Sequence, residues 1–583
     1  MSDTPRDRED VPAPESSSPS RAPADSRIDT EPGVESDRRR NVLLGLAGGG
    51  LLSLLGAGRA TGRVVPLQSR DFHDRNRLTD AFKRRLAAAR THLRGEMAVP
   101  ESNGDDDLPG YYASFTKGLP HAATGEVAAS AYESLLAALA GDEAFSAIPL
   151  GGERKLVNPE AALSYNTTGY DPHDVAMPPA PAFASDEAGA EMVELYWQAL
   201  LRDVPLESLE DSPLAMAASA ELAGLSGYTG PTAGDGSIPP DLLFRGTLPG
   251  DAVGPHLSQF LLAPIPEGDT LTIDQRYRVL AAGADYLTDY DTWLACQNGE
   301  SPTADEVYTD DRRYVTTGRD LATYVHRDFP YAAYLRAALI LLGMGAPFDP
   351  ANPLAGSGSP GSPSSAPFVD FGGNDVLDAV AGVTVPVQHA NWCHKWLVHR
   401  RLRPEAYGGR VFRTRSGEGS YPIPATLLDS QAVAETAAQF GTSLLPQAYP
   451  EGAPLHPSYP AGHAGIAGAA VTVLKAYFDE DWTLPSPVVP SADGSTLESA
   501  DATLTVGGEL NKLASNVSIG RNWAGIHYRS DAADGLRLGE QVALGYLMDR
   551  ARSYADTYDF AGFTLTTFDG ERVRITAEGV VSA

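Results

Sequence analysis

The sequence has almost no cysteine, little lysine and no long apolar run. Its 583 residues include two cysteines, Cys296 and Cys393, so a disulfide framework is excluded and at most one bridge can form. We interpret both as small buried hydrophobic residues. No uninterrupted apolar run of roughly 18 residues occurs, which argues against a membrane span.

The charge is strongly one-sided. Asp and Glu number 76 against 45 Lys and Arg, which gives a formal net charge of −31. Nucleic acid is therefore excluded as a partner, because its phosphates would be repelled over most of the surface. Only six of the basic residues are lysine. This composition resembles that of proteins from salt-loving archaea, and an ordinary acidic protein is the alternative.

The first 60 residues differ from the rest and are kept out of the fold argument. Residues 1–37 contain almost no large apolar residue, which predicts a disordered tail. The run Arg38-Arg39-Arg40-Asn41-Val42-Leu43-Leu44 follows, with a weakly apolar stretch to about Leu55. This pattern resembles a twin-arginine export signal, so we expect an extracellular or cell-surface protein. The alternative is a disordered tail with a short helix.

Apolar residues at helical spacing predict a mainly α-helical body. The expected helices lie near residues 78–93, 192–200, 276–296, 319–343, 383–402, 427–440, 463–478 and 531–550. Asp569-Gly570 stands between two alternating β-rich runs and predicts a two-residue β-hairpin within residues 563–575.

The length allows two closely packed helical subdomains. A segment rich in Gly, Ser and Pro at residues 351–366 predicts a flexible surface loop. It would separate an N-terminal helical region, 61–350, from a C-terminal bundle, 367–583, which contains the candidate site.

The first of three site segments contains Lys395 and Arg403. They are eight positions apart, so a continuous helix would place them on roughly one side, about 12 Å apart. Pro404 would break that helix and let Arg403 approach the same ligand from its end. Arginine offers a planar fork of donors and lysine a compact charge. Arg400 and Arg401 lie here too, so a basic helix face is the alternative.

The second segment is His456-Pro457-Ser458-Tyr459-Pro460-Ala461-Gly462-His463-Ala464. Gly462 permits close backbone contact just before an expected helix, whose first N–H groups can bind an anion. His463 can act as an acid or base near neutral pH. His456 and His463 could instead be a zinc pair, but no suitably spaced carboxylate or cysteine completes a metal site.

The third segment runs from Gly520 to Asp531 and adds the cation Arg521. If His527 begins a helix, Asp531 lies one turn further on the same face and could fix the imidazole tautomer. A capped helix start with a surface histidine is the alternative. Together, the three segments predict a site for a tetrahedral or trigonal-bipyramidal oxyanion, either phosphate or vanadate.

The pattern of Lys and Arg-Pro, Pro-x-Gly-His, and Arg-x5-His-x3-Asp resembles the superfamily of vanadium-dependent haloperoxidases and type 2 phosphatidic acid phosphatases. The spacing from Lys395 to Arg403, together with His456 and Trp392, favours the algal bromoperoxidase branch. The likeness extends over about residues 105–577. It implies a mainly α fold, a double helical bundle with a short C-terminal β-hairpin, and vanadate as cofactor.

The resemblance also implies roles for the matching residues in cofactor binding. His527 would bind vanadium directly through a ring nitrogen. Lys395, Arg403 and Arg521 would neutralise the vanadate oxygens. The backbone N–H of Gly462 would be a further donor.

The remaining matches are catalytic or depart from the pattern. His463 would handle the peroxide proton, and His456 would lie near the halide. Ala461 stands where the family usually has serine, so one hydroxyl donor is missing. A hydrogen bond to a charged acceptor contributes roughly 1.5–3 kcal/mol, so we expect weaker cofactor binding and an altered halide preference.

The implied activity is that of a vanadate-dependent haloperoxidase, in the first place a bromoperoxidase. It would oxidise halide with hydrogen peroxide to hypohalous acid, which halogenates a small organic acceptor. One alternative is an acid phosphatase with His527 as nucleophile and His463 as proton donor. Another is a non-catalytic phosphate-binding protein. Chain length and His456 favour the peroxidase, and relatives of this kind imply a homo-oligomer.

Overall fold

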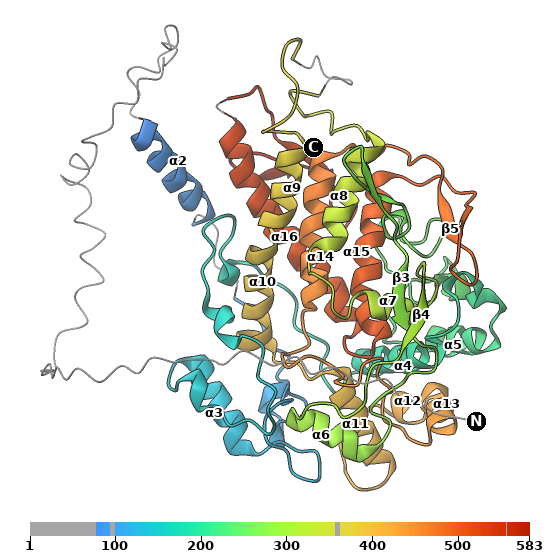
Figure 1. Cartoon of the computed structure of the whole chain (residues 1–583). Helices are drawn as coiled ribbons and strands as arrows, with labels where there is room; N and C mark the ends of the chain where they lie inside the picture. Colours follow the sequence, from blue (N-terminus) through green and yellow to red (C-terminus); the bar gives the residue numbers. More distant parts are fainter. Residues whose placement is uncertain (1–76, 94–98, 356–361, 556) are drawn as a thin grey trace, which may run out of the picture. The chain divides into compact units, whose positions relative to one another are not determined.

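The computed structural model describes residues 77–93, 99–355, 362–555 and 557–583 (Figure 1). The predicted tail and export signal, residues 1–60, lie outside these ranges, as do residues 356–361 of the predicted loop. One large hydrophobic core includes residues from both sides of that loop, from Ala113 to Ile575. The division of the chain at residues 351–366 stays a prediction.

The described residues are mainly helical, as predicted. The helices of the N-terminal half are α2 (Arg77–His92), α3 (Ala129–Ala140), α4 (Asp186–Leu201), α5 (Pro213–Ala223), α6 (Tyr290–Asn298), α7 (Gly318–Tyr324) and α8 (Ala332–Met344). Those that follow are α9 (Gly373–Gly382), α10 (Thr384–Cys393), α11 (Pro404–Arg415), α12 (Ala425–Leu428), α13 (Gln431–Phe440), α14 (Gly462–Tyr477), α15 (Val506–Trp523) and α16 (Arg529–Tyr554). None of these helices is long and apolar enough to cross a membrane.

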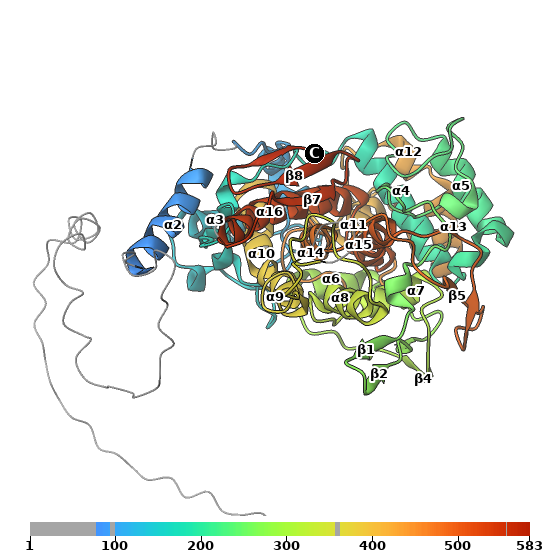
Figure 2. The same ribbon diagram turned by 90° about the horizontal axis from the view of Figure 1, so that it is seen from above.

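Helix α14 lies at the centre of the bundle, between α10, α15 and α16 (Figures 1 and 2). Glycines in α14 and α16 allow these two helices to pack closely, because a larger side chain would not fit between their backbones. A Cβ atom on Gly468 would lie 2.0 Å from the Leu536 carbonyl oxygen, and one on Gly539 would lie 2.2 Å from that of Gly465. Along α14, only His463 is not buried. That residue stands in the first turn, where the site forms.

The β structure is peripheral. Three two-stranded antiparallel sheets pair β1 (Ile265–Glu267) with β2 (Leu271–Ile273), β3 (Tyr277–Leu280) with β4 (Tyr308–Arg313), and β5 (Val488–Pro490) with β6 (Leu497–Ser499). A fourth, three-stranded sheet contains β7 (Phe563–Thr566), β8 (Arg572–Ile575) and β9 (Val580–Ser582). It packs on α14 and α16 (Figure 2).

The C-terminal hairpin is confirmed, but its turn is longer than predicted. Strands β7 and β8 pair from Phe563 with Ile575 to Thr566 with Arg572. The backbone N–H of Thr567 then donates to Glu571, and Gly570 closes the turn at φ +83°. Asp569-Gly570 therefore belongs to a three-residue connection, in which glycine takes the left-handed position.

Two predicted helices were wrong in extent. The region 276–296 contains β3 and then α6, because the alternating Tyr277–Leu280 run pairs with β4. The region 319–343 divides into α7 and α8, and Pro330 lies in the connection.

The third correction concerns the first site segment. Helix α10 continues as a π-helical stretch, His394–His399, and stops at Arg400, whose φ is +38°. The chain is held in this turn because the Arg400 carbonyl accepts a hydrogen bond from the Phe115 N–H at 2.7 Å. Lys395 and Arg403 therefore do not share one helix. Arg403 instead precedes Pro404, the first residue of α11.

Candidate active site

Lys395 is fully buried and fixes the loop that leads into α14. Its Nζ donates to the carbonyl oxygens of Pro457, at 2.7 Å, and Ser458, at 2.8 Å, and also contacts that of Pro460. These contacts use all three ammonium donors. Burial, with the charge of Arg403 nearby, lowers the pKa of Lys395 well below its ordinary value. The amino group of Lys395 therefore lies beneath the loop and holds its backbone in place.

Arg403 joins the second and third segments. Its NH1 lies 2.9 Å from the Ile526 carbonyl oxygen and 2.8 Å from Nε2 of His527. Its NH2 lies 2.9 Å from Nδ1 of His456. Burial lowers the pKa of Arg403 to about 9. The sequence predicted that Arg403 approaches the same ligand as Lys395, which stays a prediction; in the structure its guanidinium contacts His527 and His456.

His527 is held by Asp531 across the start of α16. The helix begins at Arg529, two residues later than expected, with Tyr528 as N-cap. Asp531 Oδ2 accepts hydrogen bonds from the Tyr528 N–H at 3.1 Å and from Nδ1 of His527 at 2.8 Å. Burial, together with Arg403 and Lys395, lowers the pKa of His527 well below its ordinary value. The ring is therefore neutral, with its proton on Nδ1 and a lone pair on Nε2.

The start of α14 is open to an anion. Ala461 is the N-cap and supplies no side-chain hydrogen bond, so the first N–H groups of α14 have no cap. The Ala461 N–H donates to the Asp531 carbonyl at 2.9 Å, which places this helix start beside the His527 segment. A Cβ on Gly462 would lie 3.5 Å from Gln388 and 3.6 Å from Trp392, which is ordinary contact. Neighbouring protein atoms therefore do not require glycine at this position.

Arg521 and His463 lie on the side formed by the connection after α7. Arg521 NH1 donates to the Val325 carbonyl at 2.6 Å, and its buried Nε has no hydrogen-bond partner among the described residues. His463 Nε2 lies 2.8 Å from Oδ1 of Asp328. Burial alone would raise the pKa of Asp328, but the contact with His463 outweighs it and lowers that pKa.

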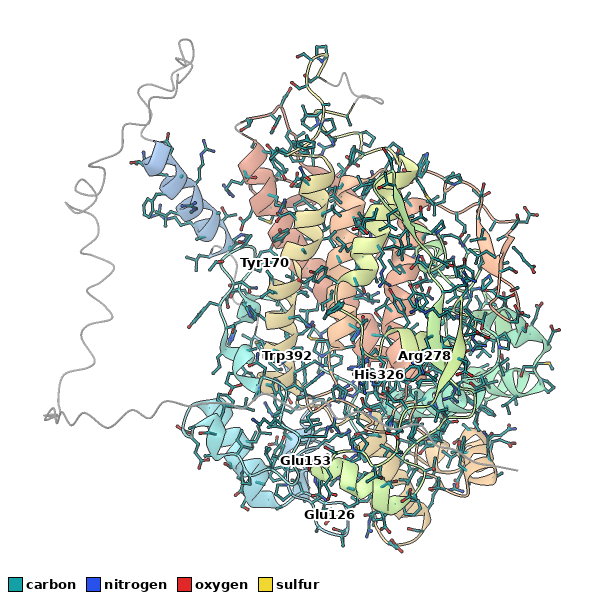
Figure 3. All side chains as sticks on the ribbon, in the orientation of Figure 1. Glu126, Glu153, Tyr170, Arg278, His326 and Trp392 are labelled. Atoms are coloured by element: carbon teal, nitrogen blue, oxygen red, sulfur yellow. The ribbon has the colours of Figure 1, made fainter. Side chains whose placement is uncertain are left out.

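His456 is buried against Trp392, with the two ring centroids 5.0 Å apart. Burial and the charge of Arg403 lower the pKa of His456 well below its ordinary value, so the ring is neutral. Trp392 donates from its indole nitrogen to the Val157 carbonyl at 3.0 Å. It lies at the lower end of α10 in the view of Figure 3. These contacts make one apolar wall of the site.

Sequence reasoning missed the residues that support the site. Asp328 follows α7 and has no motif around it, so only the fold brings it to His463. Arg401 was taken only as part of a basic face, yet it pairs with Glu191 and Asp531, each at 2.8 Å. The sequence signal for this second network was a pair of acidic residues, Glu191 and Glu194, among the apolar residues of helix α4.

The predicted cations are buried without carboxylate partners. Among the described residues, neither Lys395, Arg403 nor Arg521 forms an ion pair. Buried charges are normally paired, so the three cations together with the Nε2 lone pair fit a multiply charged oxyanion with a metal at its centre.

Both cysteines are free and buried, as expected, and burial raises their pKa to about 11 for Cys296 and about 12 for Cys393.

Known proteins are similar to this chain in sequence and in fold. A family model described as the VCPO second helical-bundle domain matches residues 389–557. A vanadium-dependent bromoperoxidase of Ascophyllum nodosum is 36% identical over 530 residues, which cover 86% of this chain and 92% of that protein. The chain belongs to the vanadium-dependent bromoperoxidase family.

Other members of the vanadium-dependent bromoperoxidase family agree with this assignment. A vanadium-dependent bromoperoxidase of Corallina pilulifera is 34% identical over 86% of this chain and 98% of its own length. The solved structure of the second bromoperoxidase from Ascophyllum nodosum, a homohexamer, has a TM-score of 0.82. That match is 29% identical and covers 93% of this chain and 98% of the other. The helical-bundle fold and the vanadate cofactor expected from the sequence are thereby confirmed.

Proposed function

We propose that this protein oxidises bromide with hydrogen peroxide and releases hypobromous acid, which brominates a small organic acceptor. The observation that carries the proposal is the neutral His527, whose Nε2 lone pair lies among three buried cations without carboxylate partners. A site that bound only water or a metal cation would not require this excess of positive charge.

We assign each residue of the site a separate role in binding vanadate. His527 Nε2 would be the vanadium ligand, oriented by Asp531. Arg403, Arg521 and the Gly462 N–H would donate to oxygens, and Lys395 would contribute charge through the loop that it fixes. When bound, vanadate supplies a Lewis acid that activates peroxide toward halide. The protein supplies fixed charge and orientation, which cost no reorganisation during the reaction.

We propose that His463 transfers the proton that this reaction needs. Oxidation of one bromide by one hydrogen peroxide consumes one proton and yields hypobromous acid and water. The side chain of His463 is 20% exposed, so it can exchange protons with solvent, and Asp328 holds its Nε2 in place. His456 is neutral and packed on Trp392. We place it at the halide side as a polar member of an otherwise apolar wall.

The phosphatase reading uses the same histidines and is not favoured by the family assignment. One experiment compares the two activities. The protein is loaded with orthovanadate and assayed with bromide, peroxide and a phenolic dye between about pH 4 and 8, where a histidine would titrate. Vanadate-dependent bromination is expected. Hydrolysis of an aryl phosphate that vanadate inhibits, with no bromination, would establish the phosphatase instead.

Three further properties are proposed on sequence grounds. Arg38-Arg39 and the following apolar stretch support export by the twin-arginine route, which a reporter fusion of residues 1–60 tests. The net charge of −31 supports function in concentrated salt, and full stability without KCl would contradict it. The second bromoperoxidase of Ascophyllum nodosum is a homohexamer, which supports a homo-oligomer here, so light scattering should give a mass above that of one chain.

A further inference from the structure

A second cluster of metal-binding side chains lies outside the anion site. It contains Glu306 before β4, His326 after α7, and Glu451 in the loop that leads to His456. One ligand atom from each residue can be chosen so that all three lie within 4.8 Å of one another. Figure 3 shows His326 near the lower end of the central helices. Three segments distant in sequence therefore converge on one small volume.

The histidine of this cluster is rigidly held. Its ring stacks on Tyr449, with the centroids 3.6 Å apart and the planes 4° apart. Its Nε2 lies 2.7 Å from Oε1 of Glu451, and its Nδ1 lies 3.4 Å from Oε1 of Glu306. Only 6% of the His326 side chain is exposed. The imidazole edge, not its face, is presented to the two carboxylates.

Two buried polar atoms of the cluster have no hydrogen-bond partner among the described residues. They are Nδ1 of His326 and Oε2 of Glu451. Nδ1 is near Glu306, but the direction does not allow a hydrogen bond. A buried polar atom without a partner is costly, and an ion bound at the cluster would supply partners for such atoms.

The competing explanation is an ion-pair network without a metal. Arg327 NH2 lies 2.8 Å from Glu306 Oε1, and the Tyr308 hydroxyl donates to the other oxygen at 2.7 Å. Nε2 of His326 pairs with Oε1 of Glu451 at 2.7 Å in this explanation too. This explanation accounts for Glu306, but it leaves the His326 Nδ1 and Glu451 Oε2 atoms unpaired.

We propose that Glu306, His326 and Glu451 bind a divalent cation of the zinc or manganese class. One imidazole nitrogen with two carboxylate oxygens suits Zn²⁺ or Mn²⁺ better than Ca²⁺, which prefers oxygen ligands alone. Solvent would complete the coordination. A cavity of about 220 Å³ is lined in part by Glu451, Thr288 and Pro302, so it adjoins one carboxylate of the cluster.

The position of this cation site relates it to the anion site. His326 follows Val325, whose carbonyl accepts from Arg521, and precedes Asp328, which contacts His463. A cation bound by His326 would therefore fix the short connection that positions a vanadate-binding arginine and the partner of the acid–base histidine. It would be a structural ion for the active site.

The test measures Zn²⁺ binding directly, so its result does not depend on the peroxidase activity. The full chain is stripped with a chelator, and Zn²⁺ is titrated by calorimetry with and without orthovanadate, which keeps the ion away from the anion site. We expect about one equivalent to bind in both cases. Vanadium retention in the same samples separately shows whether the anion site is functional.

The variants are Glu451→Gln and His326→Gln, with Asp305→Asn as the matched control. Asp305 is an exposed neighbour of Glu306 outside the cluster, so its change removes one nearby charge and no ligand. The two cluster variants should bind Zn²⁺ at least tenfold more weakly, and the control should bind as the wild type does. Equal binding by all, or no binding by the wild type, would overturn the proposal.

A second measurement covers the case in which a variant does not fold. The melting temperature of the unaltered chain is followed with and without Zn²⁺, and the visible spectrum is followed with Co²⁺. A rise in melting temperature and the ligand-field bands of bound Co²⁺ support the site. No change in either would identify an ion-pair network only.

Discussion

Nδ1 of His527 donates to Oδ2 of Asp531 at 2.8 Å, across the turn that begins α16. This contact fixes the proton on Nδ1 and leaves a lone pair on Nε2, which lies 2.8 Å from NH1 of Arg403 and is the ring atom able to bind a metal. The same carboxyl group accepts from Arg401 at 2.8 Å, so it is held from both sides. His527, the proposed vanadium ligand, is therefore oriented by a network that joins α16 to Arg401, just after the π-helical turn.

The first prediction concerns this contact. Asp531→Asn removes the charge that favours the Nδ1–H tautomer, so vanadate affinity should fall about 10–100-fold. Equilibrium dialysis with vanadium analysis measures it. Asp534→Asn is the control, because that carboxyl group accepts from Tyr459 and does not contact His527. Equal affinities in the two variants would show that the tautomer is set in another way.

The second prediction separates cofactor binding from proton transfer. Asp328→Asn leaves His527 and the side chains that contact it unchanged, but it removes the carboxylate that orients His463. We expect kcat to fall by about tenfold and the vanadium content to stay the same. His463→Ala should lower kcat by about 10²-fold or more, since it removes the acid–base group itself. Loss of vanadium in Asp328→Asn would instead place that residue among the cofactor-binding groups.

The third prediction concerns Ala461. Ala461→Ser adds a hydroxyl group at the N-cap of α14, where it can donate to a vanadate oxygen. The gain of a hydrogen bond to a charged group predicts about tenfold tighter vanadate binding. Without vanadate, the same hydroxyl can cap α14 and raise the unfolding free energy by about 1 kcal/mol. Dialysis and thermal unfolding measure the two effects. Greater stability with unchanged affinity would assign the hydroxyl to capping alone.

The sequence predicted that the three segments come together, and the structure shows this, but it did not predict the path of the chain between them. Lys395, Arg403, His463 and His527 were recognisable because their residue types and spacing follow from oxyanion chemistry. The helix expected to join Lys395 to Arg403 was wrong, because the turn at Arg400 depends on a hydrogen bond from Phe115. Local periodicity does not contain that distant contact.

The supporting residues could not be predicted for a similar reason. Asp328 and Val325 reach the site only because α7 ends beside α15, which is a matter of packing. The helix α14 was predictable, since its Ala and Gly content favours close packing and its start is marked by Pro460. Strand β3 was missed for the same reason. Its partner, β4, lies about 30 residues further along the chain, and the local spacing of apolar residues does not reveal such a distant pairing.

The fourth prediction concerns stability and pH. Glu540 on α16 accepts from the Phe568 N–H at 2.9 Å, and burial raises its pKa to about 7. The folded protein therefore holds a proton that the unfolded chain has lost between about pH 4.5 and 7. Because of this, its contribution to stability is present at low pH and is lost as the pH rises through 7.

Glu540→Gln keeps the acceptor and removes the titration. The variant should be more stable than the wild type at pH 8, by on the order of 1 kcal/mol or more, and the difference should disappear near pH 4. Denaturant unfolding at both pH values measures it. Glu571→Gln, on the exposed hairpin turn, is the control and should change neither value. A Glu540→Gln variant that is less stable at pH 8 would contradict the assignment.

The last prediction tests the vanadium ligand itself. X-ray absorption at the vanadium edge of the orthovanadate-loaded protein reports which atoms surround the metal. The account predicts a shell of oxygens with one imidazole nitrogen, and His527→Ala should lose that nitrogen or fail to retain vanadium. A shell of oxygens alone in the unaltered protein, identical in His527→Ala, would contradict it.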